Sequence, residues 1–315
     1  MGAIYWKELE DHFASWRYLV LVILVCFVSI FAVWVASQTI IDNVRSYPTE
    51  SVFLRIFVTG KGSLPPFFEF VMRWFGPLIG ILLGFDAINS ERSRGTLSRI
   101  LSQPVYRDAV INGKFLAGLT VIAVMMGAII VLVSALGLIQ TGITPSSAEV
   151  ARLVCFYLIS VVYIGFWLAL GMLFSVLFRS TIFSALVPLA LWLFFAVFMV
   201  MIAGAVADWK EPINSDSQAS DLVHNINLER QVKRISPLGL SWEASRFVLD
   251  PEQRTSDLAE PGEMVESQAF GTPPTVSLRQ SITLVWPHIV VLVGLIGICF
   301  AASYIRFVKE EIRAT

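Results

Sequence analysis

Residues 18–41 read YLVLVILVCFVSIFAVWVASQTII, a run of 24 residues without a charged side chain. The hydrocarbon core of a bilayer is about 30 Å thick, and about 20 apolar residues in a helix cross it. The backbone finds no water inside that core, so a segment that spans it must satisfy its own hydrogen bonds as a helix. This stretch therefore predicts a transmembrane helix.

Five more runs along the chain have the same character, and the composition agrees with them. Hydrophobic residues make up 56% of the chain and charged residues 15%, whereas soluble domains have about 45–50% and about 25%. The predicted fold class is an all-α polytopic membrane protein with six transmembrane helices. The expected spans are 18–41, 67–88, 114–138, 152–178, 182–207 and 285–305.

Composition and motifs also exclude several kinds of chemistry. The formal net charge of −1 leaves no electrostatic footprint for nucleic acid. Gly113-Lys114 is the nearest approach to a phosphate-binding loop, but Asp108 replaces its first glycine and Phe115 its Ser or Thr. Histidines and cysteines lack metal-ligand spacing. We therefore expect no catalytic residue, no metal site and no cofactor bound by this chain.

The distribution of Lys and Arg between short loops predicts the orientation. The 89–114 loop carries five basic residues and 139–151 carries none, and basic loops remain on the cytoplasmic side. We expect a multi-pass protein of the cell inner membrane with both termini in the cytoplasm. The chain then divides into 1–207 with five spans, an extracytoplasmic segment 208–284, and 285–315 with the last span and a cytosolic tail.

The first residues of the chain, 3–17, are amphipathic. Their apolar side chains fall within about 100° of a helical wheel, as in a helix that lies along a membrane surface in contact with lipid. Such an elbow helix either only anchors the chain or also touches a cytosolic partner. The residues assigned to it are Trp6, Leu9, Phe13 and Trp16.

The loop between the second and third spans is predicted to hold a short exposed helix. Gly95 suits a left-handed helix end, and Thr96 suits the N-cap of the next helix. Apolar side chains at i, i+3 and i+4 form a face within a rim of arginines, which favours docking on a partner; a helix folded back on the membrane surface is the alternative. The candidate docking residues are Glu91, Arg92, Arg94, Gly95, Thr96, Leu97, Arg99, Ile100, Leu101 and Pro104.

Two features inside the spans bear on helix packing. Gly76, Gly80 and Gly84 recur every four residues on the second span. They give it a smooth face for close helix contact, either within this chain or with another subunit. Pro188 is expected to kink the fifth span, because proline removes a helix hydrogen bond and clashes with the preceding turn.

Charged residues near the predicted outer surface allow more than one interpretation. Glu69 and Arg73 stand at i, i+4, either as an interfacial ion pair or as the lining of a lateral substrate portal. The 208–284 segment has seven basic and twelve acidic residues and is expected to contain helices at 220–235 and 239–249. It either covers the exit or recognises a substrate or a periplasmic protein.

Several motifs carry a resemblance to a known family. The run GFDAINSERSRGTL at 84–97, followed by LSQPV at 101–105 and GKF at 113–115, resembles permeases of the ABC-2 type. The chain is similar to the branch that includes the membrane subunit of the nitrous-oxide-reductase maturation transporter, through ISP at 235–237 and WEA at 242–244. With the six spans and the elbow helix, the resemblance covers nearly the whole chain.

The resemblance implies the transmembrane permease subunit of an ABC transporter, usually an exporter, that pairs with a second copy or a homologue. ATP and Mg would bind to separate ATPase subunits, and the 89–104 segment would be the coupling helix that enters a groove on the ATPase. The shortest family members lack an outer segment as long as the 77 residues of 208–284, so the substrate does not carry over. The alternative is a non-transporting ABC-like scaffold that passes ATP-driven motion to a periplasmic partner.

Overall fold

The computed structural model describes residues 2–42, 51–62, 64–93, 95, 107–212, 219–250 and 277–309. Within these residues the chain is helical apart from turns and an isolated bridge between Lys61 and Leu64. Six helices are long and apolar enough to cross a membrane: Trp16–Asp42, Phe67–Ser93, Asp108–Thr141, Ser147–Leu177, Thr181–Lys210 and Leu278–Lys309. The predicted fold class and the six predicted spans are confirmed, with ends shifted by up to seven residues.

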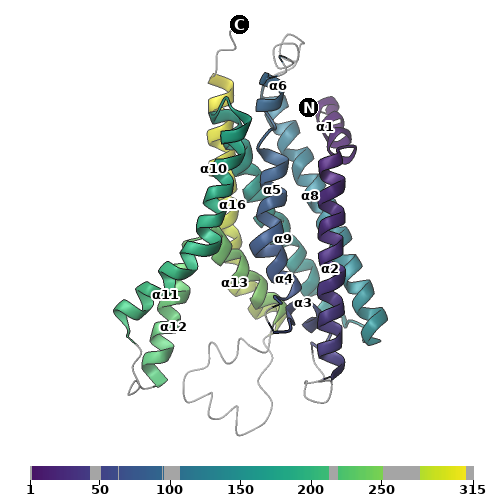
Figure 1. Cartoon of the computed structure of the whole chain (residues 1–315), viewed down its shortest axis with the longest axis vertical. Coiled ribbons are helices and arrows are strands. Elements are labelled where there is room, and N and C mark those ends of the chain that lie inside the picture. Colours follow the sequence, from purple (N-terminus) through teal and green to yellow (C-terminus); the bar gives the residue numbers. More distant parts are fainter. Residues whose placement is uncertain are drawn as a thin grey trace.

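The second and fifth spans are built from several shorter elements (Figure 1). The helical elements are α1 (Gly2–Phe13), α2 (Trp16–Asp42), α3 (Arg55–Val58), α4 (Phe67–Glu69), η2 (Phe70–Phe75), α5 (Gly76–Gly84), α6 (Asn89–Ser93), α8 (Arg107–Thr141), α9 (Ser147–Leu177), α10 (Thr181–Leu193), η3 (Phe194–Phe198), α11 (Met199–Lys210), α12 (Ala219–Lys233), α13 (Pro237–Leu249) and α16 (Leu278–Lys309). The elements η2 and η3 are π-helical turns. Both termini lie at one end of the bundle, at the top of Figure 1.

Helix α9 is the centre of the bundle. It packs against α5, α8, α10, α13 and α16 and contributes the fully buried rings of Phe156, Tyr163 and Trp167. A capping box fixes where it begins, because the Ser146 hydroxyl accepts from the Glu149 backbone N–H while the Glu149 carboxylate accepts from the Ser146 backbone. The same carboxylate accepts a hydrogen bond from the backbone N–H of Phe53.

The glycine face of the second span lies against α9. A Cβ atom at Gly80 would stand 2.5 Å from the Ile164 carbonyl oxygen, and one at Gly84 would stand 2.6 Å from the Leu168 carbonyl oxygen. Only hydrogen fits at these two positions. The interpretation of this face as a contact within the chain is therefore confirmed, and a seam with another subunit at Gly80 and Gly84 is excluded because α9 occupies the space.

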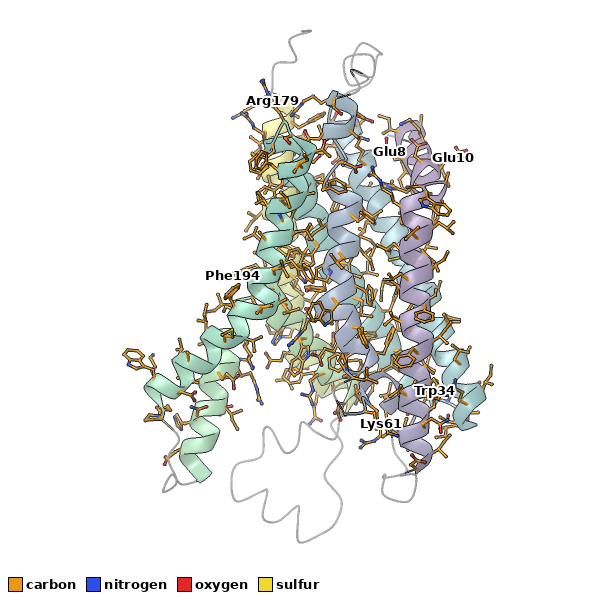
Figure 2. All side chains as sticks on the ribbon, viewed as in Figure 1. Glu8, Glu10, Trp34, Lys61, Arg179 and Phe194 are labelled. Atoms are coloured by element: carbon orange, nitrogen blue, oxygen red, sulfur yellow. The ribbon has the colours of Figure 1, made fainter. Side chains whose placement is uncertain are left out.

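The fifth span departs from regular α geometry at η3 rather than at Pro188. Helix α10 continues through Pro188 to Leu193, and the π-helical turn follows directly. From there α11 leaves the bundle at an angle, and Phe194 marks the change of direction (Figure 2). The predicted kink at Pro188 is thus displaced by about one and a half turns, since a π turn widens the helix and redirects it.

The first helix is shorter than the predicted 3–17. It ends at Phe13, and Trp16 opens α2 instead of closing the elbow helix. Ser15 separates the two, and its carbonyl oxygen accepts the first hydrogen bond of α2 from Leu19 N. Serine is favoured at the N-cap of a helix, so a new helix with a new direction begins after Ser15.

The two helices predicted between the last spans are present but are placed differently from each other. Helix α12 packs against α11, outside the bundle, whereas α13 packs between α9 and α16. Arg152 on α9 fastens α13, because its Nη1 atom donates to the Val248 carbonyl oxygen and to Ser281 Oγ, both at 3.1 Å.

Replacing Gly80 by Ala should destabilise the bundle by about 1–3 kcal/mol, because the added methyl overlaps backbone atoms of α9 that cannot move independently. Gly297→Ala on α16 is the matched control, since nothing lies within 4 Å of its added Cβ and alanine favours the helix. Thermal unfolding of the detergent-purified variants measures both. Equal unfolding temperatures for the two variants would contradict the close α5–α9 contact.

Candidate functional site

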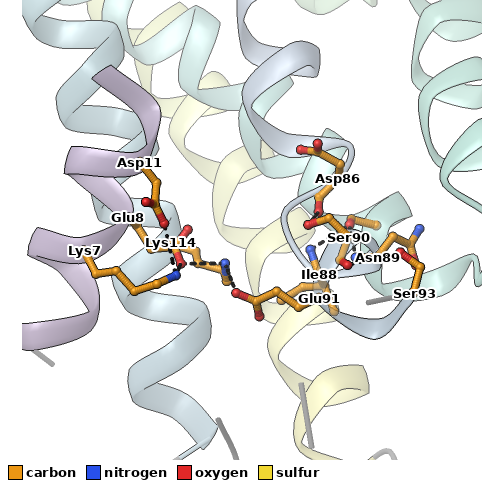
Figure 3. A network of polar contacts seen from close by, with 11 residues as sticks. Lys7, Glu8, Asp11, Asp86, Ile88, Asn89, Ser90, Glu91, Ser93 and Lys114 are labelled. Atoms are coloured by element: carbon orange, nitrogen blue, oxygen red, sulfur yellow. Dashed lines mark hydrogen bonds and ion pairs between the residues drawn. The ribbon is translucent and has the colours of Figure 1, made fainter. Parts of the chain in front are cut away.

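A buried ion-pair network joins three helices at the end of the bundle that carries the termini. The ammonium nitrogen of Lys114 on α8 lies 2.9 Å from Glu8 Oε1 on α1 and 2.9 Å from Glu91 Oε1 on α6 (Figure 3). The Lys114 side chain is 5% exposed and both carboxylates are 11% exposed. One cation thus holds together the first helix, the third span and the end of the second span.

The approach of α1 to α8 depends on a small residue beside the lysine. A Cβ at Gly113 would come within 3.0 Å of the Ile4 side chain, so glycine lets α1 lie close enough for Glu8 to reach Lys114. Lys7 adds a second cation, 3.2 Å from Glu8 Oε1. Burial alone would raise the pKa of the Glu8 carboxyl, but Lys114 and Lys7 outweigh it, and the pKa is lowered.

The second span is interrupted between α5 and α6, where residues 85–88 form turns. Side chains of neighbouring helices bond to the backbone there. Ser175 Oγ on α9 accepts from the N–H groups of Ile88 and Asn89, at 3.0 and 3.1 Å, and Ser184 Oγ on α10 donates to the Phe85 carbonyl oxygen. These serines keep the interruption stable inside the protein, since bare backbone groups are costly there.

A cavity of about 680 Å³ lies beside the network, between α1, α2, α5 and α8. Charged side chains of α1 and α6 line one part of it, and apolar residues such as Leu82 and Met125 line another. Arg17 Nη1 on α2 reaches Asp86 Oδ2 at 2.6 Å and so links the first span to the interrupted part of the second.

The predicted docking residues are only partly within the described structure. Glu91 and Arg92 lie on α6, and Glu91 belongs to the buried network. Gly95 adopts a φ of +68°, and its N–H bonds to the Arg92 carbonyl oxygen at 3.2 Å, so the predicted left-handed helix end is confirmed. The residues outside the described structure are Arg94, Thr96, Leu97, Arg99, Ile100, Leu101 and Pro104.

The four residues assigned to the elbow helix do not share one environment. Leu9 packs against the core of the bundle, whereas Trp6, Phe13 and Trp16 are 66%, 42% and 74% exposed. The three exposed rings suit the headgroup region of a membrane, which amphipathic aromatics prefer. The inward face of α1 is the one that carries Glu8.

At the opposite end, the predicted pair of Glu69 and Arg73 is present. Arg73 Nε lies 3.4 Å from Glu69 Oε1, and both side chains are partly exposed. Arg73 sits in the π turn η2, and its carbonyl oxygen accepts from Trp192 Nε1 at 2.8 Å. The ion-pair interpretation is confirmed, and the portal stays a hypothesis.

A second charge cluster lies near that opposite end, around the buried carboxylate of Glu243 on α13. Arg234 donates two hydrogen bonds of 2.6 Å to the carboxylate of Glu243, and His288 Nε2 lies 3.2 Å from Glu243 Oε2. Burial alone would raise the pKa of Glu243, but the hydrogen bonds from Arg234 and His288 prevail and hold the pKa at about 2. The carboxylate is therefore charged at neutral pH.

A family model described as ABC-2 family transporter protein matches residues 2–312, almost the whole chain. The chain belongs to this family. A search of curated proteins with the sequence of this chain found no match.

Membership of the ABC-2 family identifies the chain as a multi-pass membrane permease subunit of an ABC transporter. Members are membrane subunits that lack the ATPase site, so an ABC ATPase is the partner that the family implies. In this permease, Glu91 of the Lys114 network precedes Gly95 by four residues along the predicted docking segment.

The sequence analysis of this permease did not find the Lys114 network. Glu8 stood on the polar side of an amphipathic helix, and such charges usually face solvent. Lys114 was counted as a basic residue at the end of a loop and as part of the GKF motif, and no partner was predicted for it, although it lies seven residues after the start of α8. No local pattern connects positions 8, 91 and 114, so only the packing of α1 on α8 reveals the contact.

Replacing Lys114 by Met should destabilise the permease by about 3–5 kcal/mol, because two buried carboxylates then lose their shared cation. Lys7→Met is the matched control and should have little effect, since the Lys7 side chain is 57% exposed. Thermal unfolding in detergent compares them. Adding Glu8→Gln and Glu91→Gln to Lys114→Met should restore part of the lost stability. Two outcomes would count against the network: no recovery in this triple variant, or equal destabilisation by Lys114→Met and Lys7→Met.

Proposed function

We propose that this chain is the permease of an ABC exporter and that the Lys114 network couples it to the ATPase. The observation that carries the proposal is the contact between Lys114 and Glu91, four residues before Gly95. An ATPase that holds residues 96–104 would pull on α6 directly. The buried lysine would pass that displacement to α8 and α1, because breaking the pairs inside the protein is costly.

The interruption at residues 85–88 supports this mechanism. It separates the short helix α6 from α5, which is locked against α9 through Gly80 and Gly84. A pull on α6 would tilt it about the interruption while α5 keeps its place, at the cost of the hydrogen bonds that Ser175 accepts from Ile88 and Asn89. A few residues at the end of an element commonly absorb such a change. The motion would reach α8 first, since Lys114 lies near its N-terminal end.

The family supports the proposed assembly, and the loop charges support its orientation. Two permease copies, or this chain and a homologue, would form the translocation path, with ATP and Mg held by two ATPase subunits. Arg179 and the network of Glu8 lie at the end with both termini (Figure 2), and the basic loops favour the cytoplasm for that end. The branch that includes the nitrous-oxide-reductase maturation transporter is the proposed relationship within the family.

Single cysteines test the orientation. A cysteine in place of Ser217 or Ser256 should react with a membrane-impermeant thiol reagent in intact cells, and one in place of Ser98 should react only after the cells are opened. The native cysteines Cys26, Cys155 and Cys299 lie within spans and give the background in the parent chain. Labelling of Ser98→Cys alone in intact cells would reverse the orientation.

The docking segment is tested by the double variant Leu97→Asp and Ile100→Asp. Two carboxylates placed in an apolar groove would lose their hydration, so co-purification of the ATPase should fall at least tenfold while the permease still inserts into the membrane. Arg99→Ala should weaken association less, and mainly at low salt, where charges on the rim are least screened. ATPase recovery at the wild-type level by an inserted double variant would refute this role for the segment.

A further inference from the structure

A cavity of about 290 Å³ lies at the end of the bundle opposite the termini, between the α11–α12 pair and α13. Its apolar lining comes from η3 and α11, through Phe195 and Met199, and from α13, through Leu238 and Trp242. Basic side chains approach it from three elements, including Arg73 of η2 and Arg246 of α13. An apolar wall with a few convergent charges is the usual composition of a ligand site.

The charge balance of the lining favours an anion. It contains four basic and three acidic side chains. The carboxylate of Glu243 is already bonded to Arg234 and His288, which are not part of the lining. The negative charge of Glu243 is therefore matched from outside, as the positive charge of Arg73 is by Glu69. The other charged residues of the lining are three basic and two acidic, so the cavity keeps an excess of positive charge.

Arg246 is the residue best placed to bind that anion. Its guanidinium carbon lies 4.8 Å from the centre of the Trp242 ring, one helical turn earlier on α13. Among the described residues it forms no ion pair, whereas Lys233 is paired with Glu229 and Arg73 with Glu69. The Trp242 ring thus supports the guanidinium from one side, and the planar fork of N–H donors on an arginine suits a phosphate.

The surroundings of the cavity indicate what the anion is attached to. A volume of about 290 Å³ holds a phosphate headgroup but not the hydrocarbon chains of a lipid. Helix α11 runs away from the bundle beside the cavity and leaves apolar side chains uncovered, with Met201 65% and Ile202 41% exposed. A hydrocarbon chain lying along α11 would cover them.

We infer that this cavity binds the phosphate headgroup of an anionic amphiphile, with Arg246 contacting the phosphate and the hydrocarbon chain lying on α11. The site is separate from the Lys114 network, which lies at the other end of the bundle. The inference concerns binding and holds whether the amphiphile is cargo or a bound membrane lipid. It gives Arg73, singled out as a portal residue, a place at the edge of this site.

Native mass spectrometry of the detergent-purified full chain tests the site with two probes of equal chain length, lysophosphatidylglycerol and lysophosphatidylcholine. The anionic lysophosphatidylglycerol should bind at least tenfold more tightly, because the choline cation of lysophosphatidylcholine neutralises the phosphate that Arg246 would bind. Arg246→Gln should remove most of that preference. Arg279→Gln is the matched control, since Arg279 is exposed on α16 and does not line the cavity.

Arg246→Lys keeps the charge but loses the forked N–H donors of the guanidinium. Its preference for the anionic probe should lie between those of wild type and Arg246→Gln, so this variant tests the site if the glutamine variant fails to fold. Inorganic phosphate at millimolar concentration distinguishes a free anion from an amphiphile and should displace little of the bound probe. Equal binding of the two probes, an unchanged preference in the folded Arg246 variants, or full displacement by phosphate would each overturn the inference.

Discussion

The ammonium of Lys114 sits between two carboxylates, and all three side chains are almost completely buried. Moving each of these charged groups out of water costs on the order of several kcal/mol. The attraction between the ammonium and the two carboxylates offsets that cost only while the three groups stay together. The position of α1 on the bundle, the position of α6 and the start of α8 therefore depend on one another. A displacement of any one of them has to move the others or separate buried charges.

The rest of the bundle gives this network a rigid support. Helix α9 lies in the middle, and the second span approaches it so closely that its backbone meets Gly80 and Gly84 without an intervening side chain. In a membrane, where lipid is as apolar as leucine, such close packing is a main source of helix association. The result is a fixed α5–α9 pair, and the turns at 85–88 separate this pair from α6.

The opposite end of the molecule is organised by different means. A π turn in the fifth span directs α11 out of the bundle, and α12 folds back against it, while Arg152 and the Glu243 cluster hold α13 between the spans. Helix α12 thus stands apart together with α11, the last part of the fifth span, whereas α13 belongs to the core. The cavity lies where these two parts meet.

The sequence by itself determined the six spans, because a bilayer demands about 20 apolar residues per crossing whatever they pack against. It also determined the left-handed end at Gly95 and the close approach at the glycine repeat, since both follow from the missing side chain of glycine. Tertiary structure alone decided that Glu8, Glu91 and Lys114 meet, that the fifth span turns at Phe194 and not at Pro188, and that α13 enters the bundle. These outcomes depend on which helices become neighbours, and contacts between residues far apart in the chain leave no local pattern from which to predict them.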